Sequence, residues 1–464
     1  MACRASEPRD DASLRDGRGR WWWGWLVLLW ILRPSEARAE APKVDGPAPL
    51  ELSAGPPDDP VRLRLGASVW VRGEIHQQPE TTWAVPQRTR VEAQARWRGL
   101  SSFVQIQDVR SWGTEPSTTS TPATTGLHQG YLELGGRRGA AEGFIRVGRQ
   151  EHFLGSMRLI GTAPWNPNMR SFDAIRLRGS HGPFSIDVTG ALVRAPGSFT
   201  ITDEAGNERT LRYGAEGVLM AAFGVAAHEA IELEGYLLVH DQTPTPEAPT
   251  RDRVVISPGA RVSGKPWRGL SYDLEGYVQT GRWDGRGHGA ALGAATVGYR
   301  WAHRPNPRVE AGYVVATGSG CAPREDGVSC DRDLHRDFDG FFGARHRFLG
   351  IIDAFAPTNV HDAWLGLRVE PAAWAELRAE AHHFMLFDPT GRWLATNGSP
   401  VADPNPYNRE HTVGEELDLR ASLHPWGPLT VQVGYAVLVP TGAGPGMIGE
   451  HPWQLGYLIT QLAF

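Results

Sequence analysis

The chain has 464 residues, of which 41% are hydrophobic and 21% are charged, and its formal net charge is −5. A mildly acidic balance argues against a nucleic-acid partner, because domains that bind nucleic acids are usually basic. Beyond the N-terminal region no run of 18 uninterrupted apolar residues occurs, so the sequence predicts no transmembrane helix there.

The N-terminus has the pattern of a cleaved secretory signal peptide. Three arginines within residues 15–20 precede the apolar run Trp21–Leu32, and Ala37-Arg38-Ala39 then places small residues at the two positions that a signal peptidase reads. The run is shorter than the roughly 20 residues of a membrane span, although a membrane anchor is the alternative. We therefore expect a signal peptide over residues 1–39 and a short periplasmic segment over residues 40–60. Cleavage leaves 40 basic and 47 acidic residues and a formal charge of −7.

Two cysteines, Cys321 and Cys330, remain in the expected mature chain, in the turn-rich sequence CAPREDGVSC. In an exported protein the two are expected to form a local disulfide. A zinc pair is the weaker interpretation, because zinc ligands are usually spaced more tightly and no second cysteine pair exists. The sequence predicts no metal site and no cofactor.

From Val61 onward the chain repeats short segments in which apolar residues alternate with polar ones. Val61–Glu74, Ile231–His240 and Glu416–Leu423 are examples, and clusters of Gly, Pro, Asn and Asp separate such segments. This period of two is typical of strands with two different faces, one apolar and one charged. Long amphipathic helices are not evident in the sequence, which indicates an all-β protein.

Roughly 425 residues of such sheet are too many for one soluble core, since single cores stop growing at about 250 to 300 residues. A closed barrel in a membrane turns the apolar faces to lipid and the charged faces to a wet interior. We therefore predict a transmembrane antiparallel β-barrel over residues 61–464. The stretches Thr114–Thr125, Thr243–Pro249 and Asn397–Asn408 are expected to be long loops between strands.

The end of the chain indicates the bacterial outer membrane. Phe464 closes the apolar segment LGYLITQLAF, which resembles the terminal strand signal of bacterial outer-membrane barrels and is the expected membrane-insertion signal. Tryptophans recur beside the turns, as expected of aromatic girdles at the two interfaces. The expected partners are outer-membrane lipid and lipopolysaccharide, together with the barrel-assembly machinery of a Gram-negative cell.

The most charged part of the barrel sequence runs from Gly148 to Arg178. Its two ends alternate like strands, and its middle is rich in arginine, glycine and proline. The connection is either an inward-folded loop that narrows the pore or a plain extracellular loop, and its Trp165 either anchors the loop or stacks on sugar rings.

Arginines in strand-like positions are the candidates for an anion-selective lining. Guanidinium groups suit carboxylates, because they stay charged and offer planar forked donors. The candidate pore-lining residues are Arg88, Arg90, Arg110, Arg149, Arg158, Arg170 and Arg176. The acids expected to hold them by ion pairing are Asp108, Glu133, Glu151 and Asp173. The alternative is that these arginines and acids simply neutralise each other inside a wide lumen.

Several blocks of the chain resemble the alginate export family, outer-membrane barrels similar to the porin through which alginate leaves Gram-negative cells. The blocks include QRTRVEAQARW (Gln87–Trp97), the Gly148–Arg178 stretch, FDGFFGARHRFLGIIDAFAPTNVHDAWLGLRVEP (Phe338–Pro371) and GEELDLRASLHPWGPLTVQVGYAVLVPTG (Gly414–Gly442). Residues 87–442 carry the best resemblance. It implies a barrel of about 18 strands with an electropositive constriction. It also implies an acidic polysaccharide, such as alginate or a related polyuronate, as substrate, and periplasmic export partners.

Two other classes of function stay open on the sequence alone. A barrel enzyme is disfavoured, because HEAIE at His228 lacks the second histidine of a zinc protease motif and no GxSxG sequence is present. A general or differently selective porin is the stronger alternative. Acids on what are expected to be inward faces favour it, namely Glu232, Glu234, Asp273, Glu275 and Glu376.

Overall fold

The computed structural model describes most of the chain beyond residue 49. The described residues are 50–56, 59–78, 80–114, 123–202, 206–228, 230–325, 327–330 and 334–464. The expected signal peptide, residues 1–39, lies outside them, as does most of the expected periplasmic segment 40–60.

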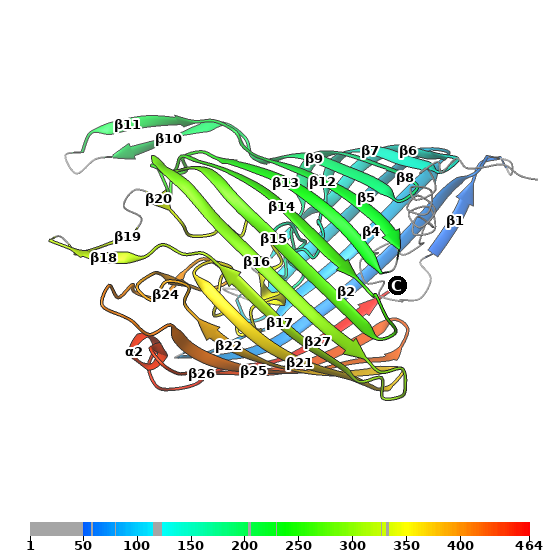
Figure 1. Cartoon of the computed structure of the whole chain (residues 1–464). Coiled ribbons are helices and arrows are strands. Elements are labelled where there is room, and N and C mark those ends of the chain that lie inside the picture. The colour runs from blue at the N-terminus through cyan, green and yellow to red at the C-terminus, as the bar shows by residue number, and fades with distance from the viewer. Residues whose placement is uncertain are drawn as a thin grey trace, which may run out of the picture.

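Within the described residues, eighteen antiparallel strands form a closed barrel, which confirms the predicted fold (Figure 1). Each strand pairs with the next along the chain, and β2 pairs with β27 to close the ring. The strands are β2 (Val61–Gln78), β4 (Pro86–Trp97), β5 (Leu100–Ser111), β6 (Thr124–Arg138), β7 (Ala141–Gln150), β8 (Phe172–His181), β9 (Phe184–Arg194), β12 (Glu216–His228), β13 (Ile231–Gln242), β14 (Arg253–Gly264), β15 (Leu270–Trp283), β16 (Arg286–Arg300), β17 (Arg308–Ala316), β21 (Val360–Ala372), β22 (Ala375–Met385), β25 (Thr412–Trp426), β26 (Leu429–Pro440) and β27 (Trp453–Ala463).

Short elements decorate the two ends of the barrel. They are β1 (Leu50–Ala54), β3 (Glu80–Ala84), β10 (Gly197–Thr202), β11 (Glu208–Tyr213), β18 (Cys321–Arg324), β19 (Gly327–Cys330), β20 (Leu334–His335), η1 (Arg345–Arg347), β23 (Trp393–Leu394), β24 (Pro400–Ala402) and α2 (Gly444–Ile448). No helix in the described part of the chain has the length and apolar character needed to cross a membrane.

The two ends of the barrel differ in the length of their connections. The C-terminus, β1 and tight turns such as Arg98-Gly99 lie at one end, and the long hairpins β10–β11 and β18–β19 project from the other (Figure 1). Outer-membrane barrels have short periplasmic turns and long extracellular loops, so the end with β1 is periplasmic. In the extracellular hairpin β18–β19, Cys321 and Cys330 are joined by a disulfide.

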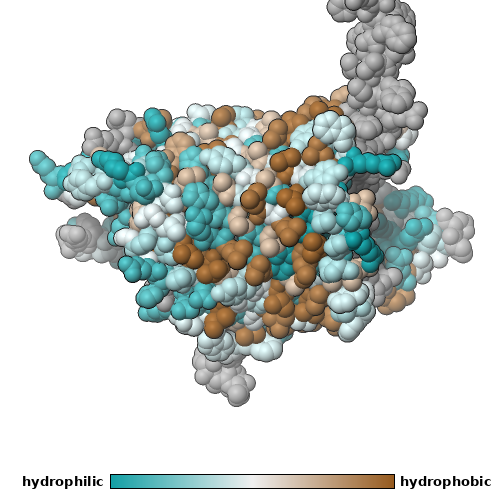
Figure 2. All heavy atoms as spheres, turned by 60° about the horizontal axis from the view of Figure 1, so that its bottom comes forward, coloured by the Kyte–Doolittle hydropathy of each residue, from teal (hydrophilic) through white to brown (hydrophobic). Residues whose placement is uncertain are grey.

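Alternation along each strand separates a lipid face from a lumen face. On β6, Leu132 and Leu134 are each 60% exposed on the outside, whereas Glu133 between them points inward to Arg146. Figure 2 shows hydrophobic side chains gathered on the wall between two more hydrophilic ends. Exposed tryptophans such as Trp267 and Trp426 stand at the periplasmic turns, where an aromatic girdle is expected.

Two extracellular connections fold into the lumen. Residues 151–171, which link β7 to β8, meet residues 336–359, which lie between β20 and β21, in a short parallel bridge from Ile160 to Phe342. Apolar side chains of both loops, among them Leu159 and Phe355, are almost fully buried between the loops and the wall. The connection after Gly148 is therefore the inward-folded loop of the two forms considered from the sequence.

Candidate functional site: a basic cavity in the lumen

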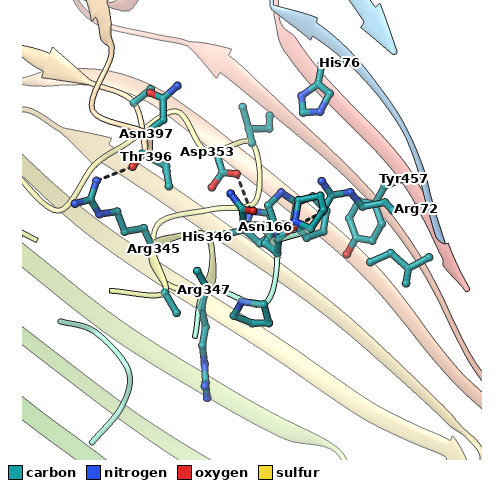
Figure 3. A pocket seen from close by; sticks show the side chains of 18 of the residues that line it. Arg72, His76, Asn166, Arg345, His346, Arg347, Asp353, Thr396, Asn397 and Tyr457 are labelled. Atoms are coloured by element: carbon teal, nitrogen blue, oxygen red, sulfur yellow. Dashed lines mark hydrogen bonds and ion pairs between the residues drawn. The ribbon is translucent and has the colours of Figure 1, made fainter. Parts of the chain in front are cut away.

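A cavity of about 730 Å³ lies between the two inward loops and the wall formed by β2, β25, β26 and β27 (Figure 3). Its charged lining is strongly basic. Among the described residues that line it, Asp353 is the only carboxylate, and the arginines are Arg72, Arg170, Arg345, Arg347 and Arg420. Arg72 and Arg420 are paired with Glu74 and Glu380, whereas Arg170, Arg345 and Arg347 have no carboxylate partner among the described residues.

Arg170 fastens the two inward loops to each other. Its guanidinium donates to the carbonyl of Gly161 at 2.8 Å, within its own loop, and to the carbonyls of Phe342 and Gly343 in the other. Burial, and then the positive charge of Arg345, lower the pKa of Arg170 to about 10. At neutral pH the group is therefore still charged, and its hydrogen-bond acceptors among the described residues are uncharged carbonyl oxygens.

Arg345 and Arg347 are the first and last residues of the single turn η1 in the second loop. Arg345 donates to the carbonyls of Thr396 at 2.8 Å and Phe341 at 3.1 Å, and burial lowers its pKa. Arg347 points away from the other labelled side chains (Figure 3), and it is exposed. Its surroundings desolvate it and Arg378 adds a second positive charge, and both effects lower the pKa of Arg347. Neither side chain forms an ion pair with any carboxylate of the described residues.

Trp165 ties the first loop to the wall. Its ring stacks on the imidazole of His346 at 3.8 Å between centroids, and the guanidinium of Arg72 lies 3.8 Å from the same ring. Arg72 also donates to the Trp165 carbonyl at 2.6 Å. The indole is packed between these two groups, so it anchors the loop and does not present a free face to a sugar ring.

A family model for alginate export matches residues 61–443. The chain belongs to the alginate export family. No curated protein matches it. Among solved structures it resembles Pseudomonas aeruginosa OccD3 (OpdP), with 12% identity, a TM-score of 0.56, and coverage of 92% of this chain and 99% of that one. Pseudomonas aeruginosa OccK5 (OpdH) is 9% identical with a TM-score of 0.55, over 87% of this chain and 98% of that one. Acinetobacter baumannii OccAB4 is 9% identical with a TM-score of 0.55, over 86% and 97%.

These likenesses show the fold, and together with the family they make the protein an integral outer-membrane channel. Its localisation in the outer membrane, expected from the sequence, is confirmed.

Five of the seven arginines expected to line the pore of this alginate export family member face the lumen. Arg88 donates to the Pro167 carbonyl at 3.3 Å, and Arg90 donates to the Gln107 amide at 2.8 Å. The others are Arg158, which pairs with Glu275 at 3.0 Å, Arg170, and Arg176, which pairs with Asp187. Only Arg170 lines the basic cavity.

Two of the four expected supporting acids also lie on the lumen side. Glu133 pairs with Arg146 at 2.5 Å. Glu151 contacts the ring of His128 at 2.8 Å and Arg90 at 3.5 Å. Both therefore hold basic groups of the wall, although Arg146 and not one of the expected arginines is the partner of Glu133.

Arg110, Arg149, Asp108 and Asp173 were expected in the lumen, and the strand register corrects this. Asp108 and Arg110 alternate with the buried Gln107 and share the outer face of β5 with Ile106, while pairing with each other at 2.8 Å. Arg149 pairs with Asp173 at 3.0 Å on the outer faces of β7 and β8. The two pairs stand near the extracellular rim, so they do not line the pore.

Four cavity arginines are absent from the set expected from the sequence. Arg345 and Arg347 lie in FGARHRFLG, one of the blocks of family resemblance, and that block was a signal for them. Arg72 stands on the polar face of β2, and Arg420 alternates with apolar residues on β25. The alternation places both on an inner face, but only the folded loops reveal which inner positions meet the cavity.

Two acids of β25, Glu416 and Asp418, bind the backbone of the second loop and do not line the cavity. Glu416 accepts a hydrogen bond from the backbone N–H of Ile352 at 3.0 Å, and Asp418 accepts one from Ile351 at 3.2 Å. Both carboxylates are almost completely buried beneath the second loop. They hold the loop against the wall and are not exposed to a passing solute.

Proposed function

We propose that this channel passes anionic solutes, and that its substrate is an acidic polysaccharide such as alginate or a related polyuronate. The observation that carries the proposal is the cavity lined by five arginines and one carboxylate between the two inward loops. Membership of the alginate export family supports the same substrate class. A polyuronate carries one carboxylate on each sugar, so successive sugars meet successive guanidinium groups.

The arginines are suited to weak and repeated binding. Arg170 and Arg345 are tethered to backbone carbonyls, which keeps their charges in place and leaves part of each guanidinium fork for a ligand. Arg72 is instead held by the Trp165 carbonyl and by the carboxylate of Glu74 at 2.8 Å. Arg347 is exposed and points away from the other labelled side chains of the cavity (Figure 3). A moving polymer needs such shared and individually weak contacts, because a tight site would stop conduction.

Planar-bilayer recordings test the proposal. Under a salt gradient we expect a reversal potential of an anion-selective pore, and we expect block by oligouronates but not by neutral oligosaccharides. Replacing Arg345 and Arg347 by Gln should reduce anion selectivity and weaken the block on the order of tenfold. Replacing the outward-facing Arg149 and Arg110 by Gln is the matched control. Cation selectivity of the native channel, or equal block by neutral sugars, would contradict the proposal.

The second candidate is a general porin for small solutes. It is favoured by the wall from β13 to β17, where charges of both signs pair, as in the contacts of Arg261 with Glu234 at 2.5 Å and with Asp273 at 2.6 Å. A neutralised wall does not discriminate by charge. This function predicts a reversal potential near zero and block that depends on the size of an oligosaccharide but not on its charge.

A further inference from the structure

Three arginines stand together on the inner wall at the periplasmic end of the barrel. Arg62 and Arg64 lie at the start of β2, and Arg96 lies at the end of β4. In the register of these strands Arg62 is directly opposite Arg96, and Arg64 is opposite Gln94. On the other side of β2, Arg62 is opposite Ser53 and Arg64 is opposite Glu51 of β1. The three share the face of Arg72 and Arg88, which contact the lumen loop, so they point into the lumen. All three side chains are exposed.

The placement of Arg62 opposite Arg96 is electrostatically unfavourable without a ligand. Like charges directly opposite each other on neighbouring strands destabilise a sheet. In the described part of the chain, none of the three forms an ion pair. On its other side Arg96 is paired in register with the neutral Ser101. The nearest inward acid on β4, Glu92, accepts a hydrogen bond from Gln105 at 2.6 Å.

Other arginines of the inner wall are neutralised by neighbouring carboxylates. Examples at comparable positions are Arg146 with Glu133, Arg308 with Glu310, and Arg368 with Glu376. These inner-wall arginines are paired with carboxylates, whereas Arg62 and Arg96 form no ion pair among the described residues. Uncompensated, exposed guanidinium groups at a water-filled mouth attract anions from solution.

We propose that Arg62, Arg64 and Arg96 form a docking site where a polyanion with carboxylate groups, a polyuronate, first binds as it enters the channel from the periplasm. The inference rests on the proposed function and adds a location and a direction to it. The inner face of β4 continues from Arg96 to Arg90 and Arg88, which touch the inward loop that borders the cavity. The docking site thus lies on the strand face that leads, past Gln94 and Glu92, to the arginines beside the inward loop.

Sided block of single channels tests the docking site. The variant carries Arg62→Gln, Arg64→Gln and Arg96→Gln, and the probe is an oligouronate added to one side of an oriented bilayer. The matched control removes three exposed arginines at the opposite mouth, Arg209→Gln, Arg212→Gln and Arg324→Gln. Heat-dependent gel migration verifies that each barrel is folded.

The expected result is a loss on the order of tenfold in the rate of block from the periplasmic side, with the rate from the extracellular side and the reversal potential unchanged. The effect should shrink at high salt, because exposed charges are screened. The control should leave the periplasmic rate as in the native channel. Equal rates in variant and native channel would overturn the docking site alone. A native channel that no oligouronate blocks from either side would instead overturn the proposed function.

Discussion

The inner wall of β2 and β4 differs from that of β22 and β25, although both follow the same alternation of apolar and polar residues. On β22 and β25 the charges are neutralised locally, as where Glu380 contacts Arg378 at 2.5 Å and also Arg420. On β2 and β4 the neutralisation is incomplete, because Arg72 pairs with Glu74 at 2.8 Å but Arg88 meets a backbone carbonyl and Arg62 faces Arg96. Alternation creates the polar face of a strand, but the partners across the register decide whether that face attracts ions or merely fills the lumen.

The largest effect on channel conductance is expected from replacing Glu416 and Asp418 of β25, which hold the second inward loop against the wall. Replacing Glu416 and Asp418 by Ala removes both acceptors for the N–H groups of Ile352 and Ile351. The cost is about 2 to 6 kcal/mol, because two buried N–H groups are left without an acceptor. We expect larger and noisier single-channel currents as the loop leaves the wall.

Two further variants make that result specific. Glu416→Gln with Asp418→Asn retains acceptor oxygens and should stay close to the native conductance. Glu415→Ala, on the outer face of the same strand, should change nothing. Native conductance in the double alanine variant would show that the loop is held without these acids.

A second test concerns His152, a buried histidine of the first inward loop, and the stability of the protein at low pH. His152 is 1% exposed and both of its ring nitrogens lack hydrogen-bond partners in the described residues. Burial, and then the charge of Arg176, lower the pKa of His152 to about 3. An unfolded histidine titrates near pH 6.5, so between that pH and 3 the unfolded chain binds the extra proton, and stability falls as the pH falls.

The loss expected for the native protein is about 3 kcal/mol between pH 7 and pH 4. His152→Leu should remove that part of the acid sensitivity. The measurement is the thermal unfolding midpoint in detergent at both pH values. Equal pH dependence in the two proteins would show that the imidazole is not held neutral by its surroundings.

Trp165→Ala examines the contact between the basic wall and the first inward loop. It removes the stack on His346 and the contact with Arg72, at a cost of about 2 kcal/mol. Current fluctuations should increase moderately, while anion selectivity is kept. Trp267→Ala, in the exposed girdle, serves as the control. If both variants behave alike, the indole does not fasten the loop.

The smallest effect is expected from the two outward pairs. Arg110→Gln and Arg149→Gln each remove one exposed ion pair, so stability should change by about 0.5 kcal/mol or less. The reversal potential should stay native, because neither side chain faces the pore. A shift in selectivity would break the rule that the face of the strand decides the role of its charge.

The sequence contained the signal that separates these outward arginines from the inward ones. Arg110 has the same parity as Val104 and Ile106, and Arg149 the same as Ile145 and Val147, which are apolar residues that face lipid. Within the Gly148–Arg178 stretch, the same parity separates the outward Arg149 from the inward Arg176. Arg146, with inward parity, is the residue of β7 that reaches the lumen and pairs with Glu133.

The sequence by itself determined the barrel. A period of two over about 400 residues gives every strand an apolar face, and a single soluble core cannot bury so many apolar faces, whereas a membrane barrel turns them to lipid. Only the tertiary structure decided which arginines form the site. Arg170 meets the Phe342 carbonyl across 172 residues of chain, and Ile352 meets Glu416 across 64. Local alternation carries no information on such distant contacts. They depend on how two loops pack against each other after the wall has closed, and that packing places the charges of the cavity.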